Sequence, residues 1–136
     1  MLTIINSYNL IDGIDGLASV VGGRFGAPHG ALCGRFLSAV LRQNLVIAEI
    51  GSNTQHRLDT CSAAIASVFP PAKGQDDLSG FEDWMQAHHL PRLADFHVKS
   101  GDLDGLAEQA LSASSSLKNA VPLTHADVLA VLRAAF

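Results

Sequence analysis

One histidine stands where a protein can hold an imidazole in a fixed position. Residues 22–41 read GGRFGAPHGALCGRFLSAVL, so His29 follows a glycine-rich turn and a proline at the start of an expected helix. Such a start can place the ring at a fixed, dry position. An isolated histidine is more often structural than a ligand, so His29 needs partners before it indicates chemistry.

The other residues able to do chemistry lack a supporting pattern. Cys33 and Cys61 lie within apolar helical patterns, which predicts reduced, structural thiols. Ser114 to Ser116 have no accompanying base, so we assign no catalytic residue there. The remaining histidines show no zinc-site spacing with cysteines, and we expect them on helix surfaces. These histidines are His56, His88, His89, His97 and His125.

The apolar residues recur at intervals of three and four, which predicts helices and almost no sheet. We therefore expect an all-α domain of five to six helices. The first helix should stop at Gly22-Gly23, a pair suited to left-handed backbone beyond a helix end. The expected helices cover about residues 10–21, 29–49, 58–69, 79–90, 102–111 and 124–132.

Short polar residues mark the expected helix starts. Ser79 with Glu82, and Thr124 with Asp127, have the spacing of a capping box, and we expect Asp102 to be an N-cap. The helix after Ser79 carries an aromatic and methionine face that we expect to lie in the core. That face consists of Phe81, Trp84, Met85 and His88.

Length and composition limit the classes of function. The chain has 136 residues, 48% of them hydrophobic, which suits one domain with a sizeable core. Its formal net charge is -4, and it has no block of Lys or Arg, so nucleic acid is not an expected partner. No apolar run reaches the ~18 residues of a membrane span, and no signal peptide is recognisable. We expect a cytoplasmic protein.

The Pro-His-Gly stretch resembles the iron-containing alcohol dehydrogenase superfamily, whose helical domain carries such a histidine as a ligand of the catalytic metal. The resemblance continues through His89-Leu90-Pro91-Arg92-Leu93 and through residues 114–119, and it covers about residues 16–136. Its details are closest to the maleylacetate reductase branch. The resemblance implies that His29 is a metal ligand, with Fe(II) or Zn(II) and NAD(P) as cofactors of the intact family.

The chain departs from the family pattern at the other metal positions. The resemblance implies a second ligand histidine fourteen residues before His29 and a further active-site histidine four residues after that ligand. Those positions hold Asp15 and Ser19. Asp15 could still bind a metal through oxygen, and Asp12 lies three residues earlier on the same helical face. The family's remaining ligands and its nucleotide-binding domain have no counterpart in these residues, so we expect no tightly bound metal.

The opening residues carry a second resemblance. Residues 9–18 read NLIDGIDGLA, which is similar to the NxxDGxDGLA segment of polyprenyl-phosphate N-acetylhexosamine-1-phosphate transferases. Those enzymes have many transmembrane helices, and this chain has no candidate for one. We therefore expect residues 1–15 to be a segment of unclear origin, such as a fusion junction, and residues 16–136 to be the helical domain.

Two hypotheses of function follow. The first is a truncated helical domain of an iron-containing alcohol dehydrogenase or maleylacetate reductase-like oxidoreductase, inactive alone and without bound cofactor. The second is a stand-alone interaction module that forms a homo-oligomer through helix faces left uncovered. A separate nucleotide-binding domain is the other partner that the resemblance implies.

Overall fold

The computed structural model describes the backbone of residues 2–113 and 119–136, and within these ranges it describes side chains from residue 13 onward. Ser114 to Ser116 lie outside the described residues. The described residues form six α-helices and two short 3-10 helices without any strand, so the all-α prediction is confirmed. The elements are α1 (Leu2–Phe25), α2 (His29–Ile47), α3 (Asn53–Val68), α4 (Ser79–Ala87), η1 (Leu93–Phe96), η2 (Ser100–Asp102), α5 (Leu103–Ser112) and α6 (His125–Ala135).

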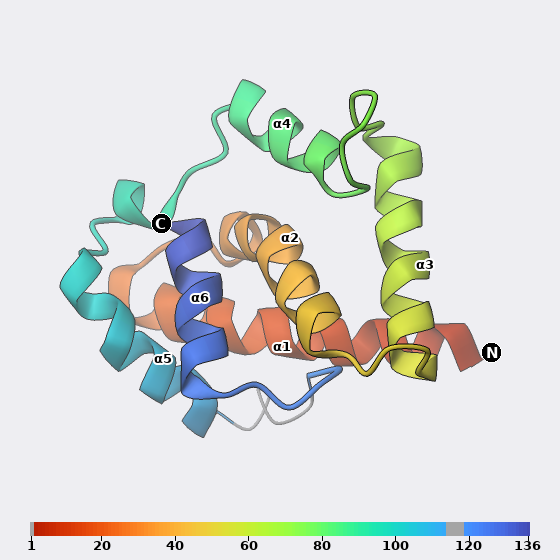
Figure 1. Cartoon of the computed structure of the whole chain (residues 1–136). Helices are drawn as coiled ribbons and strands as arrows, with labels where there is room; N and C mark the ends of the chain where they lie inside the picture. The colour runs from red at the N-terminus through yellow and green to blue at the C-terminus, as the bar shows by residue number, and fades with distance from the viewer. Residues whose placement is uncertain (1, 114–118) are drawn as a thin grey trace.

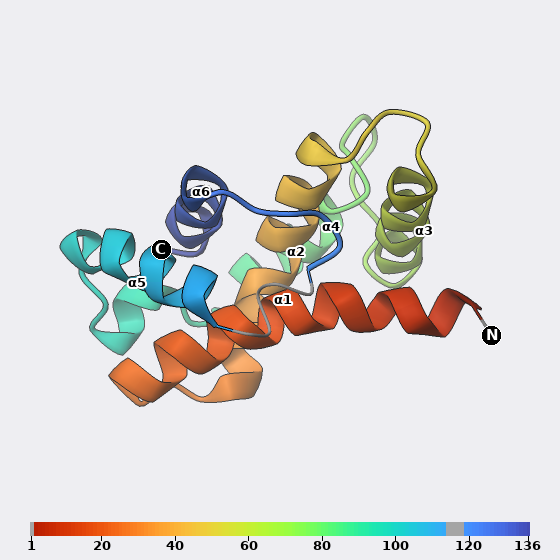
Figure 2. The same cartoon turned by 90° about the horizontal axis from the view of Figure 1, so that it is seen from below.

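Helix α2 occupies the centre of the molecule (Figure 1). It packs on α1 and on α6, while α5 contacts both α1 and α6. Figure 2 shows α1 running beneath this group along the length of the molecule. Helices α3 and α4 lie on the other side of α2 and contact it and each other.

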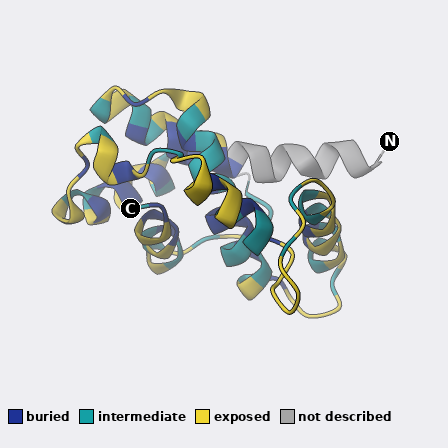
Figure 3. Cartoon of the chain, turned by 90° about the horizontal axis from the view of Figure 1, so that it is seen from above, coloured by how far each residue is buried: buried dark blue, intermediate teal, exposed yellow. Residues whose placement is uncertain are grey.

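The core lies where these helices meet, and Figure 3 marks its buried residues in dark blue. Leu32, Phe36 and Leu41 of α2 are fully buried, and they meet Leu106 of α5 and Leu132 of α6 in one apolar cluster. Burying each such side chain contributes about 1.5–3 kcal/mol to folding. This cluster fixes α2 against α1 and thereby the position of the α2 N-terminus.

The end of α1 differs from the expectation. Gly22 and Gly23 lie inside the helix, which continues to Phe25 and ends at Gly26, whose φ is +67°. The Gly26 N–H donates to the carbonyl of Gly22 at 2.9 Å, which closes the last turn. A Cβ on Gly22 would lie 3.2 Å from the carbonyl oxygen of Ala27. Gly22 is therefore needed for the close return of the chain, whereas Gly26 provides the left-handed residue.

Two of the expected caps differ in their chemistry. Ser79 is the first residue of α4 rather than its cap, and no side chain caps this helix start. Glu82 instead accepts a hydrogen bond from Arg42 at 2.7 Å. Asp102 does precede α5, but its carboxylate accepts from the Lys99 N–H of the preceding turn. Local spacing does not reveal the partner of Glu82, which lies forty residues earlier in the sequence, whereas Asp102 bonds within its own turn.

The cap of α6 agrees with the prediction. The Thr124 hydroxyl accepts from the Asp127 N–H, and the Asp127 carboxylate accepts from the Thr124 N–H at 2.7 Å. Both partners of this capping box lie within one turn of the chain, so nothing distant competes for them.

The predicted core face of α4 is half correct. Phe81 and Met85 are buried, but Trp84 is 38% exposed and His88 is exposed. The rings of Trp84 and His88 stack at 4.7 Å on the surface, because α4 is covered on only one side. Within the described residues, no helix combines the length and the apolarity of a membrane span.

Candidate functional site

The turn between α1 and α2 brings His29 and Asp15 together. His29 is the first residue of α2, and Asp15 lies in α1, fourteen residues earlier. Because α1 and α2 pack against each other, the start of α2 lies beside an earlier turn of α1. The Nε2 atom of His29 lies 2.8 Å from Oδ1 of Asp15. The two residues that the sequence analysis gave as candidate metal ligands are therefore in direct contact.

The geometry of this pair agrees with two adjacent ligands of one metal ion. Metal bonds of roughly 2.0–2.2 Å to an imidazole nitrogen and a carboxylate oxygen bring the two ligand atoms within about 3 Å of each other. Both side chains are about half exposed, at 49% for His29 and 52% for Asp15. The pair is thus open to water on one side.

The donor set is nevertheless too small for a closed metal site. Among the residues that the structure describes, no group of three or more His, Cys, Asp or Glu could hold a metal ion. The side chain of Asp12 lies outside the described set. Catalytic zinc sites ordinarily have three protein ligands, and here the two available groups already bind each other. The residues present therefore do not fit a tightly held metal.

Cys33 lies one helical turn after His29, close to the same pair. Its burial, and secondarily the charge of Asp15, raise the pKa of the Cys33 thiol. The protonated thiol is a poor metal ligand and a poor nucleophile. Burial also raises the pKa of Cys61, and both cysteines are free, which supports the structural role predicted for them.

Contacts on both sides of the site hold α1 in place. Toward the N-terminal side, the Asn119 side chain lies directly against Gly13, at a position that a Cβ would occupy. Asn119 also exchanges hydrogen bonds with the fully buried Asn44 of α2. At the other end, Arg24 forms an ion pair of 3.1 Å with Asp102. These contacts determine the register of α1, and hence where Asp15 lies.

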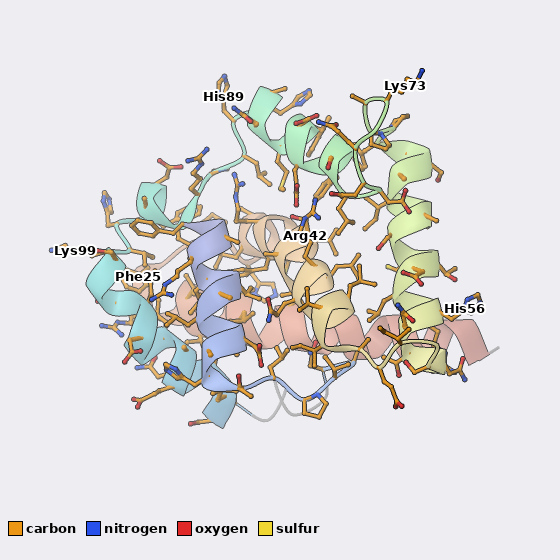
Figure 4. All side chains as sticks on the ribbon, in the orientation of Figure 1. Phe25, Arg42, His56, Lys73, His89 and Lys99 are labelled. Carbon is orange, nitrogen blue, oxygen red and sulfur yellow. The ribbon has the colours of Figure 1, made fainter. Side chains whose placement is uncertain are left out.

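The remaining histidines lie away from this pair. His56 of α3 and His125 of α6 lie on helix surfaces, as predicted, and His88 is the C-cap of α4. His89 and His97 lie instead in turns, with φ of +52° and +65°. Figure 4 shows His56 and His89 directed away from the body of the molecule.

Sequence reasoning missed one further feature. A groove of about 620 Å³ opens between α2, the end of α4 and the segment that leads into η1. Arg35 and Arg92 contribute to its lining. Its residues come from separate parts of the chain, and their spacing gave no signal. Its lining residues are Arg35, Met85, Gln86, His89, Leu90, Pro91, Arg92 and Asp95.

Comparison with known proteins assigns the fold. The family model "Fe-containing alcohol dehydrogenase family, C-terminal" matches residues 10–136. A solved structure described as "Crystal structure analysis of 1,3-propanediol oxidoreductase" matches with a TM-score of 0.64 and 25% sequence identity. The match covers 90% of this chain and 32% of that one, so the chain spans about a third of that oxidoreductase. No curated protein matches the chain.

Two observations lead to one assignment. The helices have the arrangement of part of the solved oxidoreductase, and the family model spans nearly the whole chain. The protein therefore belongs to the Fe-containing alcohol dehydrogenase family and represents its C-terminal helical domain.

Proposed function

We propose that this chain provides two positions of a divalent metal site, His29 and Asp15, and that it does not catalyse an NAD(P)-dependent reaction alone. The observation that supports this most is the 2.8 Å contact between His29 Nε2 and Asp15 Oδ1. Two residues fourteen apart in sequence meet at the atoms through which each would bind a metal.

The electrostatics of the pair argue for weak binding. A metal must displace the contact between the imidazole and the carboxylate, and it must compete with water at two half-exposed groups. In the intact family the metal would polarise the oxygen of an alcohol or aldehyde. Here the Asp15 carboxylate contacts Nε2 of His29, so this nitrogen is not free to bind the metal.

The sharpest test restores the family residue at the second position. In an Asp15→His variant the carboxylate no longer holds His29, and a second imidazole suits Fe(II) or Zn(II). We expect the Zn(II) affinity, measured by isothermal titration, to rise by about tenfold or more. Mutating residues that only hydrogen-bond to metal ligands already changes metal affinity by about tenfold. Asp59→His is the matched control, because Asp59 is an exposed aspartate of α3, and it should leave the affinity unchanged.

Elemental analysis of the dialysed wild-type protein provides the second measurement. We expect Fe and Zn far below one equivalent. Stoichiometric metal in the wild type that disappears in His29→Ala would show that the pair is a sufficient site and that our proposal is wrong.

Activity is tested with the alcohol that the description of the similar oxidoreductase names. The purified chain, with added Fe(II) or Zn(II), should not reduce NAD or NADP in the presence of 1,3-propanediol. We assign nicotinamide binding to the part of the family fold that the match does not cover. Turnover that depends on both cofactor and protein concentration would overturn this assignment.

We also propose that the domain associates with a second copy of itself. Two large apolar side chains near the end of α2 support this, because Val46 is 79% and Ile50 is 90% exposed. Sedimentation velocity should show a dimer at high micromolar concentration, and Val46→Lys should dissociate it. A strictly monomeric wild type would contradict the dimer, and binding of a separately produced nucleotide-binding domain at the same residues would replace it.

A further inference from the structure

The groove between α2 and the η1 segment is separate from the His29 and Asp15 pair, since neither residue lines it. One wall consists of Met85 at the end of α4 and of Leu90 and Pro91, which follow α4. The charged groups come from Arg35 of α2 and from Arg92 and Asp95. The groove thus combines an apolar surface with two guanidinium groups.

Arg35 is held in a fixed orientation within this groove. Its Nε donates to the carbonyl of Pro91 at 3.0 Å, and its Nη2 donates to the carbonyl of Leu90. These bonds use two of the five N–H donors of a guanidinium. Among the described residues, no carboxylate forms an ion pair with Arg35. Neutral carbonyls therefore orient the guanidinium group of Arg35, and its other N–H donors can still bind a ligand.

Arg92 adds a second positive charge, and no carboxylate of the described residues forms an ion pair with its side chain. Burial and then the nearby Arg92 lower the pKa of Arg35, which indicates that the two charges repel each other. Asp95 offsets part of this, but its carboxylate accepts the Arg92 backbone N–H at 2.7 Å and so serves the turn. The groove has two arginines against one aspartate, whereas the whole chain has a net charge of -4.

We propose that this groove binds a small organic oxyanion, with its charged end between Arg35 and Arg92 and its apolar body against Met85, Leu90 and Pro91. Planar guanidinium groups match the two oxygens of a carboxylate or phosphate. An anion there relieves the repulsion between the two arginines. His89 also contributes to the lining of the groove.

The test is isothermal titration at constant ionic strength with phenyl phosphate, benzoate and inorganic phosphate as probes. For a ligand of this size we expect a Kd on the order of 1 mM for the better of the two aromatic anions. The comparison of phenyl phosphate with benzoate distinguishes a phosphate from a carboxylate. Inorganic phosphate should bind more weakly than phenyl phosphate, because it cannot use the apolar wall.

Variants locate the site. Arg92→Gln, at an exposed side chain, should weaken binding by about tenfold or more, the value of a hydrogen bond to a charged group. Arg133→Gln, an exposed arginine of α6, is the matched control and should bind as the wild type does. Thermal unfolding of each variant verifies the fold. Absence of binding at 20-fold the expected Kd, unchanged affinity in Arg92→Gln, or an equal loss in Arg133→Gln would overturn the proposal.

Discussion

Replacing Asn44 with alanine removes one half of a buried amide pair that joins two distant parts of the chain. Asn119 donates to the Asn44 side-chain oxygen at 2.6 Å, and Asn44 donates back at 3.2 Å. Asn44 is fully buried, whereas Asn119 is half-buried and keeps a third bond, to the carbonyl of Val121. The substitution therefore removes two hydrogen bonds and leaves the Asn119 oxygen without its donor.

The magnitude follows from these contacts. The substitution removes two buried hydrogen bonds and leaves Asn119 in place without a new partner. This loss corresponds to about 2–3 kcal/mol of unfolding free energy. The unfolding entropy of a chain of 136 residues converts each kcal/mol into roughly 3–4 °C of Tm. We expect Asn44→Ala to lower Tm by about 7–10 °C. Gly13→Ala should act through the same pair, because its Cβ would occupy the place of the Asn119 side chain.

The assay is urea denaturation together with calorimetry of three variants. Asn119→Ala and the double variant complete a double-mutant cycle. The double variant should lose about 1 kcal/mol less stability than the sum of the losses in the two single variants. Asn53→Ala, at an exposed asparagine of α3, is the control and should change stability by less than about 0.5 kcal/mol. A loss below about 0.5 kcal/mol in Asn44→Ala, or strict additivity, would refute the reasoning.

Three further predictions concern the core and two ion or hydrogen-bond partners. Leu32→Ala, at a fully buried position, should cost about 2–5 kcal/mol of unfolding free energy in urea denaturation, and a loss under about 1 kcal/mol would contradict the core assignment. Thr124→Val should cost about 1 kcal/mol through the lost cap of α6. Because the hydrogen bond from Thr124 lowers the pKa of Asp127, that cost should be full near neutral pH and shrink as pH falls through the folded pKa. Arg42 likewise lowers the pKa of Asp76, so the destabilisation by Arg42→Met should diminish as the pH falls below the ordinary aspartate pKa of about 4, and a pH-independent difference would exclude this pairing.

The sequence alone determined the helical class and most helix positions. Apolar residues at helical spacing predicted α2 within two residues of its observed ends, and Thr124 with Asp127 predicted the start of α6. These signals are local, since a helix turn and its cap depend on residues three or four positions apart. The placement of His29 at a helix start has the same origin, because a proline and a preceding turn define it.

Only the tertiary structure decided which of these residues meet. Asp15 was a candidate by its distance in sequence from His29, but the contact between them depends on the packing of α1 against α2. Glu82 had a capping-box spacing, yet Arg42, forty residues earlier, is its partner. The arginines of the groove come from segments with no common pattern. Such contacts depend on how the apolar faces of whole helices pack together. A charged or buried partner that is distant in sequence can therefore outweigh the weak conformational preference of a single turn.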